Sequence, residues 1–200
     1  MFIKTLGTDP GFYFLWITVI MFSICCHEAA HAYAAYHEGD RTAVDEGYLT
    51  LNPLRVMGWQ SIIFLILCGI AWGSVPVRRD MMRRRHSPLL VSLAGPGMNL
   101  ALIAVSAVGY AIVSRVLPPE ASTIFGLGIS ANCFLLLFNM LPIPVFDGWE
   151  LYRALFPALR RVSYEQAQQW GLALLLIILV TGLHSYIWIA ASRVEMLLTI

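Results

Sequence analysis

Charged residues are scarce in this chain of 200 residues. Asp, Glu, Lys and Arg together make up 12% of it, whereas about 25% is usual in a soluble domain. Hydrophobic residues make up 58%, and the mean hydropathy is +0.71. These values exclude an ordinary soluble domain and indicate an integral membrane protein. The formal net charge is only +1 and no basic patch alternates with aromatic residues, so we expect no nucleic-acid partner.

Cysteine is also rare. The four cysteines, Cys25, Cys26, Cys68 and Cys133, all lie in apolar runs. This placement predicts buried, reduced thiols instead of a disulfide framework. Because Cys25 and Cys26 directly precede His27, a thiolate metal ligand is an alternative, but a less favoured one.

Long apolar stretches take the place of the missing charge. Five occur, at about residues 12–36, 62–72, 89–113, 124–141 and 170–189. A helix needs roughly 20 apolar residues to cross the hydrocarbon core, so four stretches are long enough or nearly so, and the second is not. No internal repeat or second soluble domain is visible. We therefore expect an all-α membrane protein, a polytopic helical bundle of four to six membrane segments that forms a single domain over residues 1–200.

The first apolar stretch contains the motif His-Glu-x-x-His, as His27-Glu28-Ala29-Ala30-His31. Positions i and i+4 share one face of a helix, so both imidazoles can reach one zinc ion. Glu28 can take a proton from the water that such an ion activates. Ionisable side chains inside a membrane helix are costly and are functional by default. A purely structural polar cluster is the weaker interpretation.

Asp147 is the candidate for a third zinc ligand, because a catalytic zinc ion takes three protein ligands and keeps one position open. It follows the fourth apolar stretch, in a segment that contains Pro142 and Pro144. The two prolines break the helix, and non-helical backbone at membrane depth is tolerated where it lines a cavity. An Asp-Gly turn at a helix exit is the alternative, which the zinc motif makes less favourable.

These motifs together resemble the site-2 protease family of intramembrane zinc metalloproteases, in particular its small members without extra domains. The resemblance runs from about residue 20 to residue 155. Besides the zinc motif, the similar segments follow the family's order: residues 49–54, 75–77, 93–99 with Ala-Gly-Pro-x-x-Asn, and 139–148 with Asn139, Pro142, Asp147 and Gly148. Phe146 stands where the family usually has Leu, and it keeps the position apolar.

The resemblance implies a zinc metalloendopeptidase that hydrolyses a peptide bond inside, or at the edge of, the lipid bilayer. Its partner would be a membrane-protein substrate. His27, His31 and Asp147 would hold the zinc ion, and Glu28 would act as general base. Asn139 is a candidate for steadying the substrate or the oxyanion, and a helix–helix hydrogen bond is an equally good interpretation of it.

The three ligands must meet at one depth, and this constrains the topology. The histidines lie near the C-terminal end of the first stretch, and Asp147 follows the C-terminal end of the fourth. These two helices should therefore run in the same direction, which requires the second stretch to enter the membrane and return. We predict a re-entrant element at about residues 57–77, in the form of an extended hairpin because of its glycines and β-branched residues. A complete span stays open as the alternative.

The basic residues favour the re-entrant arrangement. It places ten arginines on one side of the membrane and three basic residues, Lys4, Arg115 and Arg193, on the other. A spanning second stretch would give nine against four. By the positive-inside rule, we expect the amino terminus outside and the active site near the cytoplasmic face of a bacterial or archaeal plasma membrane.

Two other functions stay open, a metal transporter and a catalytically silent membrane scaffold. A transporter would need polar residues along several helices, and the third and fifth stretches nearly lack them. All expected catalytic groups are present, so nothing favours a silent scaffold. The basic run at residues 78–85 is expected to set the topology, with binding of anionic lipid headgroups as an alternative. His37, His86 and His184 are expected to be interfacial or structural.

Overall fold

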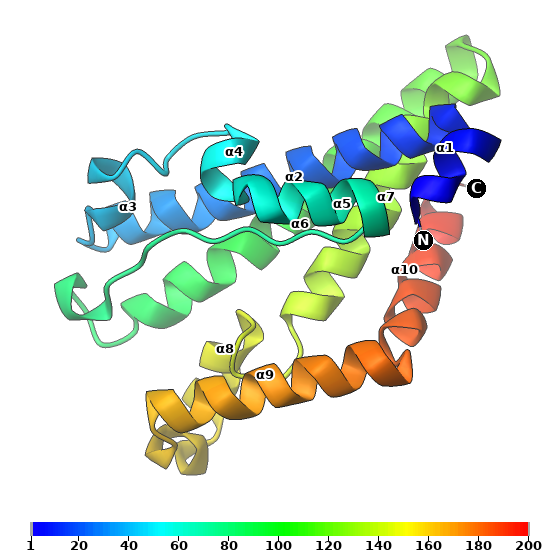
Figure 1. The fold of residues 1–200 in the computed structure, drawn as a ribbon. Coiled ribbons are helices and arrows are strands. Elements are labelled where there is room, and N and C mark those ends of the chain that lie inside the picture. Colours follow the sequence, from blue (N-terminus) through cyan, green and yellow to red (C-terminus); the bar gives the residue numbers. More distant parts are fainter. Residues whose placement is uncertain (1, 200) are drawn as a thin grey trace.

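Three long helices form the centre of the protein. The structure, a computed structural model, describes residues 2–199 (Figure 1). The central helices are α2 (Pro10–His37), α6 (Ser87–Val116) and α7 (Pro119–Asn139), and each is long and apolar enough to cross a membrane. No strand occurs within residues 2–199. The expected all-α membrane architecture is therefore confirmed.

Local sequence sets the ends of these helices. Asp9 caps α2 by accepting a hydrogen bond from the Phe12 backbone N–H at 2.9 Å, and Pro10 takes the first helical position, which tolerates proline. Beyond the end of α2, Gly39 adopts a φ of +107°. Pro118 and Pro119 separate α6 from α7, because proline fits the first turn of a helix but not its interior.

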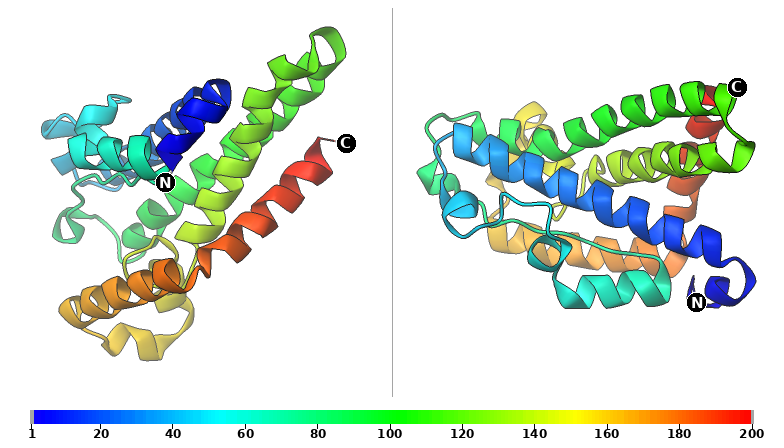
Figure 2. Two further views of the ribbon diagram at one scale, coloured as in Figure 1. Left: turned by 45° about the vertical axis from the view of Figure 1, so that its right-hand side comes forward. Right: turned by 90° about the horizontal axis from the view of Figure 1, so that it is seen from above.

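The helix α6 returns alongside α2, and α7 returns alongside α6 (Figures 1 and 2). As a result, α2 and α7 run in the same general direction, as the ligand argument requires. The main core cluster joins α2 to the second apolar stretch and to α7, through residues such as Ile24, Leu65 and Ala131. Cys25, Cys26 and Cys133 are buried, and all four cysteines are free, which confirms that they form no disulfide.

The second apolar stretch forms an outgoing helix and an extended return. The helices α4 (Pro53–Val56) and α5 (Gly58–Cys68) lead out, and the chain comes back so that the Ser74 N–H donates to the Val56 carbonyl at 3.0 Å. Ser61 Oγ joins the two arms, donating to the Trp72 carbonyl at 2.6 Å and accepting from its N–H at 2.8 Å. The predicted return is observed.

The prediction of two extended arms is wrong for the outgoing arm. Gly58 and Gly69, with φ of +72° and +77°, lie at the two ends of α5 and not in its interior. A left-handed glycine after the last turn is a common way to end a helix. These glycines therefore delimit a short helix, and only the arm after Gly69 is extended.

The fifth apolar stretch, predicted as one span at residues 170–189, is broken into two helices. α9 (Tyr164–Thr181) ends at Gly182, which has a φ of +75°, and α10 (His184–Leu198) leaves at an angle of 74°. The described residues thus contain three candidate spans, or four if the bent pair counts as one. With the shorter apolar helix α5 added, this agrees with the four to six membrane segments expected.

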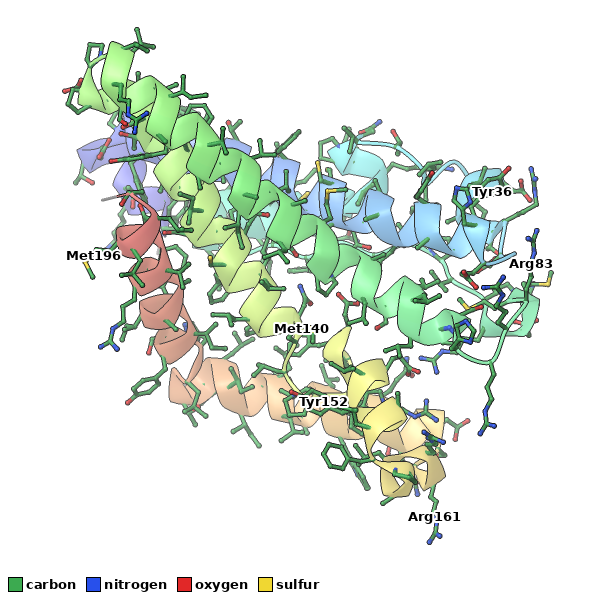
Figure 3. All side chains as sticks on the ribbon, turned by 180° about the vertical axis from the view of Figure 1, so that it is seen from behind. Tyr36, Arg83, Met140, Tyr152, Arg161 and Met196 are labelled. Carbon is green, nitrogen blue, oxygen red and sulfur yellow. The ribbon has the colours of Figure 1, made fainter. Side chains whose placement is uncertain are left out.

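The remaining elements are short. They are η1 (Phe2–Lys4), α1 (Thr5–Thr8), α3 (Thr42–Asp45), η2 (Arg79–Met81), α8 (Gly148–Leu155) and η3 (Pro157–Arg161). Of these, α8 matters most for the site, because it begins one residue after Asp147. Figure 3 shows the region from behind, with Met140 at the end of α7 and Tyr152 on α8.

Candidate active site

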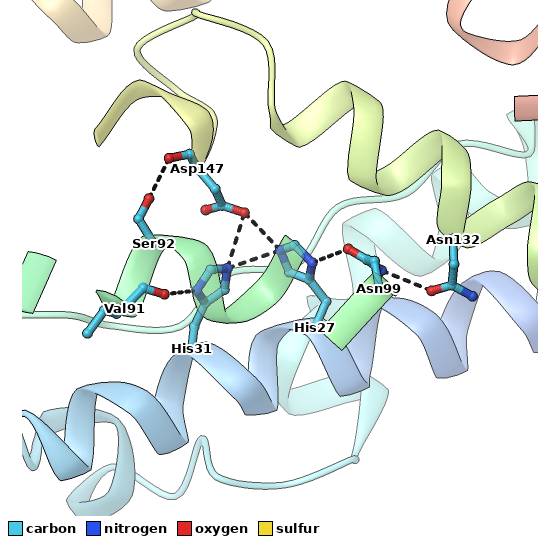
Figure 4. A network of polar contacts seen from close by, with 7 residues as sticks. All are labelled: His27, His31, Val91, Ser92, Asn99, Asn132 and Asp147. Carbon is cyan, nitrogen blue, oxygen red and sulfur yellow. Dashed lines mark hydrogen bonds and ion pairs between the residues drawn. The ribbon is translucent and has the colours of Figure 1, made fainter. Parts of the chain in front are cut away.

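The two histidines of the zinc motif and Asp147 meet between α2, α6 and the start of α8 (Figure 4). His27 and His31 are buried, at 6% and 7% exposed. Their Nε2 atoms lie 3.0 Å apart. Asp147 Oδ2 lies 3.0 Å from His27 Nε2 and 3.2 Å from His31 Nε2. Three side chains from two distant segments therefore present one atom each to a common point.

This triangle fits one zinc ion. In a tetrahedral site with zinc–ligand distances near 2.0–2.1 Å, neighbouring ligand atoms lie roughly 3.3 Å apart. The three observed separations of 3.0–3.2 Å are close to that value. The triad also satisfies the rule that a catalytic zinc has three protein ligands and one open position.

A hydrogen bond to the backbone determines which ring nitrogen of His31 is protonated, and so which one offers a lone pair to the common point of the triad. His31 Nδ1 lies 2.7 Å from the Val91 carbonyl oxygen. A carbonyl only accepts, so Nδ1 must carry the proton. The Nε2 atom of neutral His31 therefore points a lone pair at the triad.

The same conclusion holds for His27, through a longer chain of hydrogen bonds. Asn132 Nδ2 donates to the Gly128 carbonyl at 2.8 Å, so Asn132 Oδ1 must face Asn99. Asn99 Nδ2 donates to that oxygen at 2.9 Å, which turns Asn99 Oδ1 toward His27 Nδ1, 2.6 Å away. His27 Nδ1 therefore carries the proton, and its Nε2 is a lone-pair donor. Asn132 Nδ2 also donates to Ser23 Oγ at 2.9 Å.

Two lone pairs and a carboxylate thus converge with no donor between them. Such an arrangement repels itself unless a cation occupies the centre or a histidine gains a second proton. Imidazole nitrogen and carboxylate oxygen are ordinary zinc ligands. Cys25 and Cys26 do not belong to the group that could hold a metal ion, so the thiolate alternative has no support.

Two glycines allow neighbouring segments to approach the site closely. A Cβ on Gly95 of α6 would lie 2.3 Å from His31 Nε2 and 2.4 Å from His27 Nε2. A Cβ on Gly73, in the extended return arm, would lie 2.7 Å from Glu28 Cγ. Glycine is required at both positions because any side chain would enter the site.

A pocket of about 520 Å³ opens onto the triad. Glu28 and Asn139 line it together with the triad, and so do residues 71–75 and 77 on or beside the extended arm. The structure therefore brings all five residues named from the sequence, His27, Glu28, His31, Asn139 and Asp147, to one pocket. His37, His86 and His184 do not line it.

Sequence reasoning missed the residues that support the triad. Asn99 and Asn132 are fully buried, and Ser92 Oγ holds the Asp147 backbone by donating to its carbonyl at 2.5 Å. Asparagines in apolar stretches are themselves a signal, because polar groups in membrane helices are costly. Asn99 lies in the Gly-Pro-x-x-Asn segment, but its partner could be identified only from the fold.

Comparison with known proteins agrees with this geometry. The family description "Peptidase family M50" matches residues 112–182. The chain is 35% identical to the "Putative zinc metalloprotease YwhC" of Bacillus subtilis, over 87% of this chain and 83% of that protein. It is 36% identical to the "Putative zinc metalloprotease Rip2" of Mycolicibacterium smegmatis, over 86% of this chain and 68% of that protein. The "Putative zinc metalloprotease Rip2" of Mycobacterium tuberculosis is 33% identical to this chain, over 84% of this chain and 67% of that protein. No solved structure gave a significant match.

The lengths of these alignments, together with a donor set that suits zinc, settle the family. The chain belongs to peptidase family M50, the site-2 protease family, and is a zinc metalloprotease.

Proposed function

We propose that this protein is an intramembrane protease, a single domain over residues 1–200 that hydrolyses a peptide bond in or near a transmembrane segment of a membrane-protein substrate. The observation that carries the proposal is the position of the triad. Its atoms converge in a pocket among helices that are themselves long and apolar enough to cross a membrane. A soluble substrate would not need a site there.

His27, His31 and Asp147 would hold the zinc ion. A zinc ion held there would supply Lewis-acid chemistry, which would lower the pKa of a water molecule toward about 7 and polarise the scissile carbonyl. Glu28 follows His27 on α2 and lines the same pocket, so it takes a proton from water and hands it to the leaving amine. Asn139, the last residue of α7, also lines the pocket and would donate a hydrogen bond to the substrate or the oxyanion.

The substrate must unwind before cleavage, because the carbonyls of a helix are occupied by its own hydrogen bonds. The extended arm beside the pocket would receive the unwound segment as an added strand. Helix-breaking residues near the cleaved bond would favour this step. The extended course of residues 71–77 along the pocket supports the mode of binding.

We place the active site toward the cytoplasmic face of a bacterial or archaeal cell membrane. The C-terminal end of α2, the loop before α6 and the segment after α8 lie at one end of the molecule (Figures 1 and 3). These segments carry most of the arginines. The positive-inside rule assigns such an end to the cytoplasm.

Two substitutions test the mechanism. Glu28→Gln should keep about one zinc ion per chain and lower cleavage of a model transmembrane substrate by roughly 10²–10⁴-fold, because it removes only the proton acceptor. Asp147→Ala should lose zinc as well as cleavage. Metal analysis of the purified variants is the measurement. Full activity of Glu28→Gln would end the proposal, and so would inactivity of the zinc-loaded wild type on every transmembrane substrate.

A further inference from the structure

A second pocket, of about 460 Å³, lies beside the active-site pocket at the basic end of the molecule. The two pockets share Arg79, Pro88 and Glu150 in their walls. The second pocket also receives Arg85 and His86 from the loop before α6, and Arg153 and Arg160 from α8 and η3. Two segments far apart in the sequence, the loop before α6 and the region of α8 and η3, thus bring arginines to one cavity.

Hydrogen bonds fix the wall that α8 and η3 provide. Arg160 Nε donates to the Arg153 carbonyl at 2.9 Å, and one Arg160 terminal nitrogen donates to the Ala154 carbonyl at 2.7 Å. Glu150 Oε1 lies 2.7 Å from an Arg79 nitrogen and 3.4 Å from an Arg153 nitrogen. This bridge joins the loop before α6 to α8 across the pocket.

The lining carries a surplus of positive charge. Four arginines face one glutamate, so the formal charge of the lining is 4 − 1 = +3 with His86 neutral. Guanidinium groups bind phosphate oxygens in bidentate fashion and are less strongly hydrated than ammonium groups. The chemistry of the pocket therefore suits a phosphate group.

Two exposed apolar side chains adjoin the pocket, which lies at the end of the bundle. Leu155 and Phe156 directly follow the lining residue Ala154, and they are 61% and 54% exposed. Figure 3 shows Arg83 and Arg161 at this end, far from Met196. A charged cavity with exposed apolar neighbours at the end of membrane helices matches a lipid, with its headgroup in the cavity and its acyl chains outside.

We propose that this pocket binds the phosphate group of an anionic phospholipid. The bound phosphate links the loop before α6, through Arg85, to η3, through Arg160, and so adds a second link beside the ion pairs of Glu150. Because α8 begins at Gly148, the lipid also restrains the segment that carries Asp147. The lipid site is independent of the proposed protease mechanism, whereas its effect on the zinc ion rests on the proposed role of Asp147.

A matched pair of double variants tests the site. Arg85→Gln with Arg160→Gln removes two charges from the lining, and Arg84→Gln with Arg161→Gln removes two charges from adjacent positions that do not line the pocket. Native mass spectrometry of the full chain in detergent measures the retention of phosphatidylglycerol against phosphatidylcholine. We expect wild type and the Arg84/Arg161 pair to prefer phosphatidylglycerol. The Arg85/Arg160 pair should lose affinity for it by about tenfold or more, since each charged hydrogen bond lost is worth about a factor of ten.

Three results would overturn the proposal. Equal losses in both double variants would mean that total surface charge, and not the pocket, attracts the lipid. Displacement of phosphatidylglycerol by inorganic phosphate at similar concentration would mean a site for free phosphate. Competition by an acidic peptide, with no preference among lipids, would mean a site for a substrate carboxylate. Since none of these measurements uses cleavage, they stay informative even if the protease mechanism fails.

The coupling to the metal site has its own measurement. In vesicles that contain phosphatidylglycerol, the wild type should hold zinc more tightly than in vesicles of phosphatidylcholine alone, and the Arg85/Arg160 pair should show no difference. Competition with a chelator gives the zinc affinity. If wild-type zinc affinity does not depend on the lipid, the restraint of Asp147 is refuted while the lipid site itself can stand.

Discussion

At the scale of single residues, the site depends on a glycine as much as on its ligands. Gly95→Ala would place a methyl group 2.3–2.4 Å from both histidine Nε2 atoms, within the space that the zinc ion needs. Loss of a residue that hydrogen-bonds a zinc ligand lowers zinc affinity roughly 10–100-fold. We expect Gly95→Ala to lower it by at least as much. Chelator competition on the purified protein measures the loss.

Gly97→Ala is the matched control for this prediction. Gly97 lies on the same helix, and a Cβ there has nothing within 4 Å. Both substitutions raise helix propensity, by about 1 kcal/mol in an exposed helix. A general effect on α6 would therefore act on both variants alike, and equal zinc affinity in the two would refute the steric argument.

Asn99 tests the orientation of His27. Asn99→Ala removes the acceptor of the His27 Nδ1 proton, so zinc affinity should fall roughly 10–100-fold. Asn99→Asp keeps an oxygen toward Nδ1 but faces Asn132 Oδ1 with a second acceptor. It should retain zinc better than Asn99→Ala and still unfold at a lower temperature than wild type. If Asn99→Asp binds zinc as weakly as Asn99→Ala, the oxygen that faces His27 Nδ1 is not what supports this ligand.

At the scale of elements, the sequence predicted best where a local signal ends a helix. Pro10, Gly39 and Pro118 mark the ends of α2 and α6, and the expected stretches match these helices closely. The break between α9 and α10 at Gly182 was not predicted. Apolar residues continue on both sides of it, so the composition indicates a single span. The partners of Asn99 and Asn132 could not be predicted, because three helices must pack before these side chains meet.

Asp40 secures the end of the extended arm to the end of α2. The buried carboxylate accepts from the Thr42 N–H at 2.9 Å and from the Arg78 N–H at 2.5 Å. Asp40→Asn replaces one acceptor by a donor, and we expect it to cost about 2 kcal/mol of stability at neutral pH. Asp45→Asn, on an exposed side chain whose ion pair with Arg41 spans 3.4 Å, should cost less than about 1 kcal/mol. Thermal unfolding in detergent compares the two.

The effect of Asp40 should depend on pH in a defined direction. Burial alone would raise the pKa of Asp40, but hydrogen bonds from Thr42 and the Arg78 backbone N–H outweigh it and hold the pKa below its usual range. A carboxyl with a lowered folded pKa stabilises the protein above its ordinary pKa of about 3.9, and the contribution is lost as pH falls through the folded value. The gap between wild type and Asp40→Asn should therefore shrink below about pH 4. A gap that grows on acidification would contradict this assignment.

At the scale of the whole molecule, one requirement links the metal site to the topology. Ligands near the C-terminal ends of α2 and α7 meet only if these helices point the same way, and the structure shows that they do (Figures 1 and 2). The chain between α2 and α6 must then begin and end on one side of the membrane. The return of the extended arm to Val56 provides this, since it brings the chain back to the start of α5.

Accessibility labelling tests this arrangement in cells. Single cysteines at Glu46 and Met81, both exposed, stand on the two sides of the α5 excursion, and one at Thr123 marks the far end of α7. The background carries Cys68→Ser, because Cys68 is the native cysteine that is not fully buried. If α5 re-enters, an impermeant maleimide should treat Glu46→Cys and Met81→Cys alike, reaching both only after lysis. It should reach Thr123→Cys in intact cells.

Opposite labelling of Glu46→Cys and Met81→Cys in variants that still bind zinc would mean that the second stretch spans the membrane. In that case the re-entrant topology would have to be abandoned, together with the parallel course of α2 and α7 across the membrane.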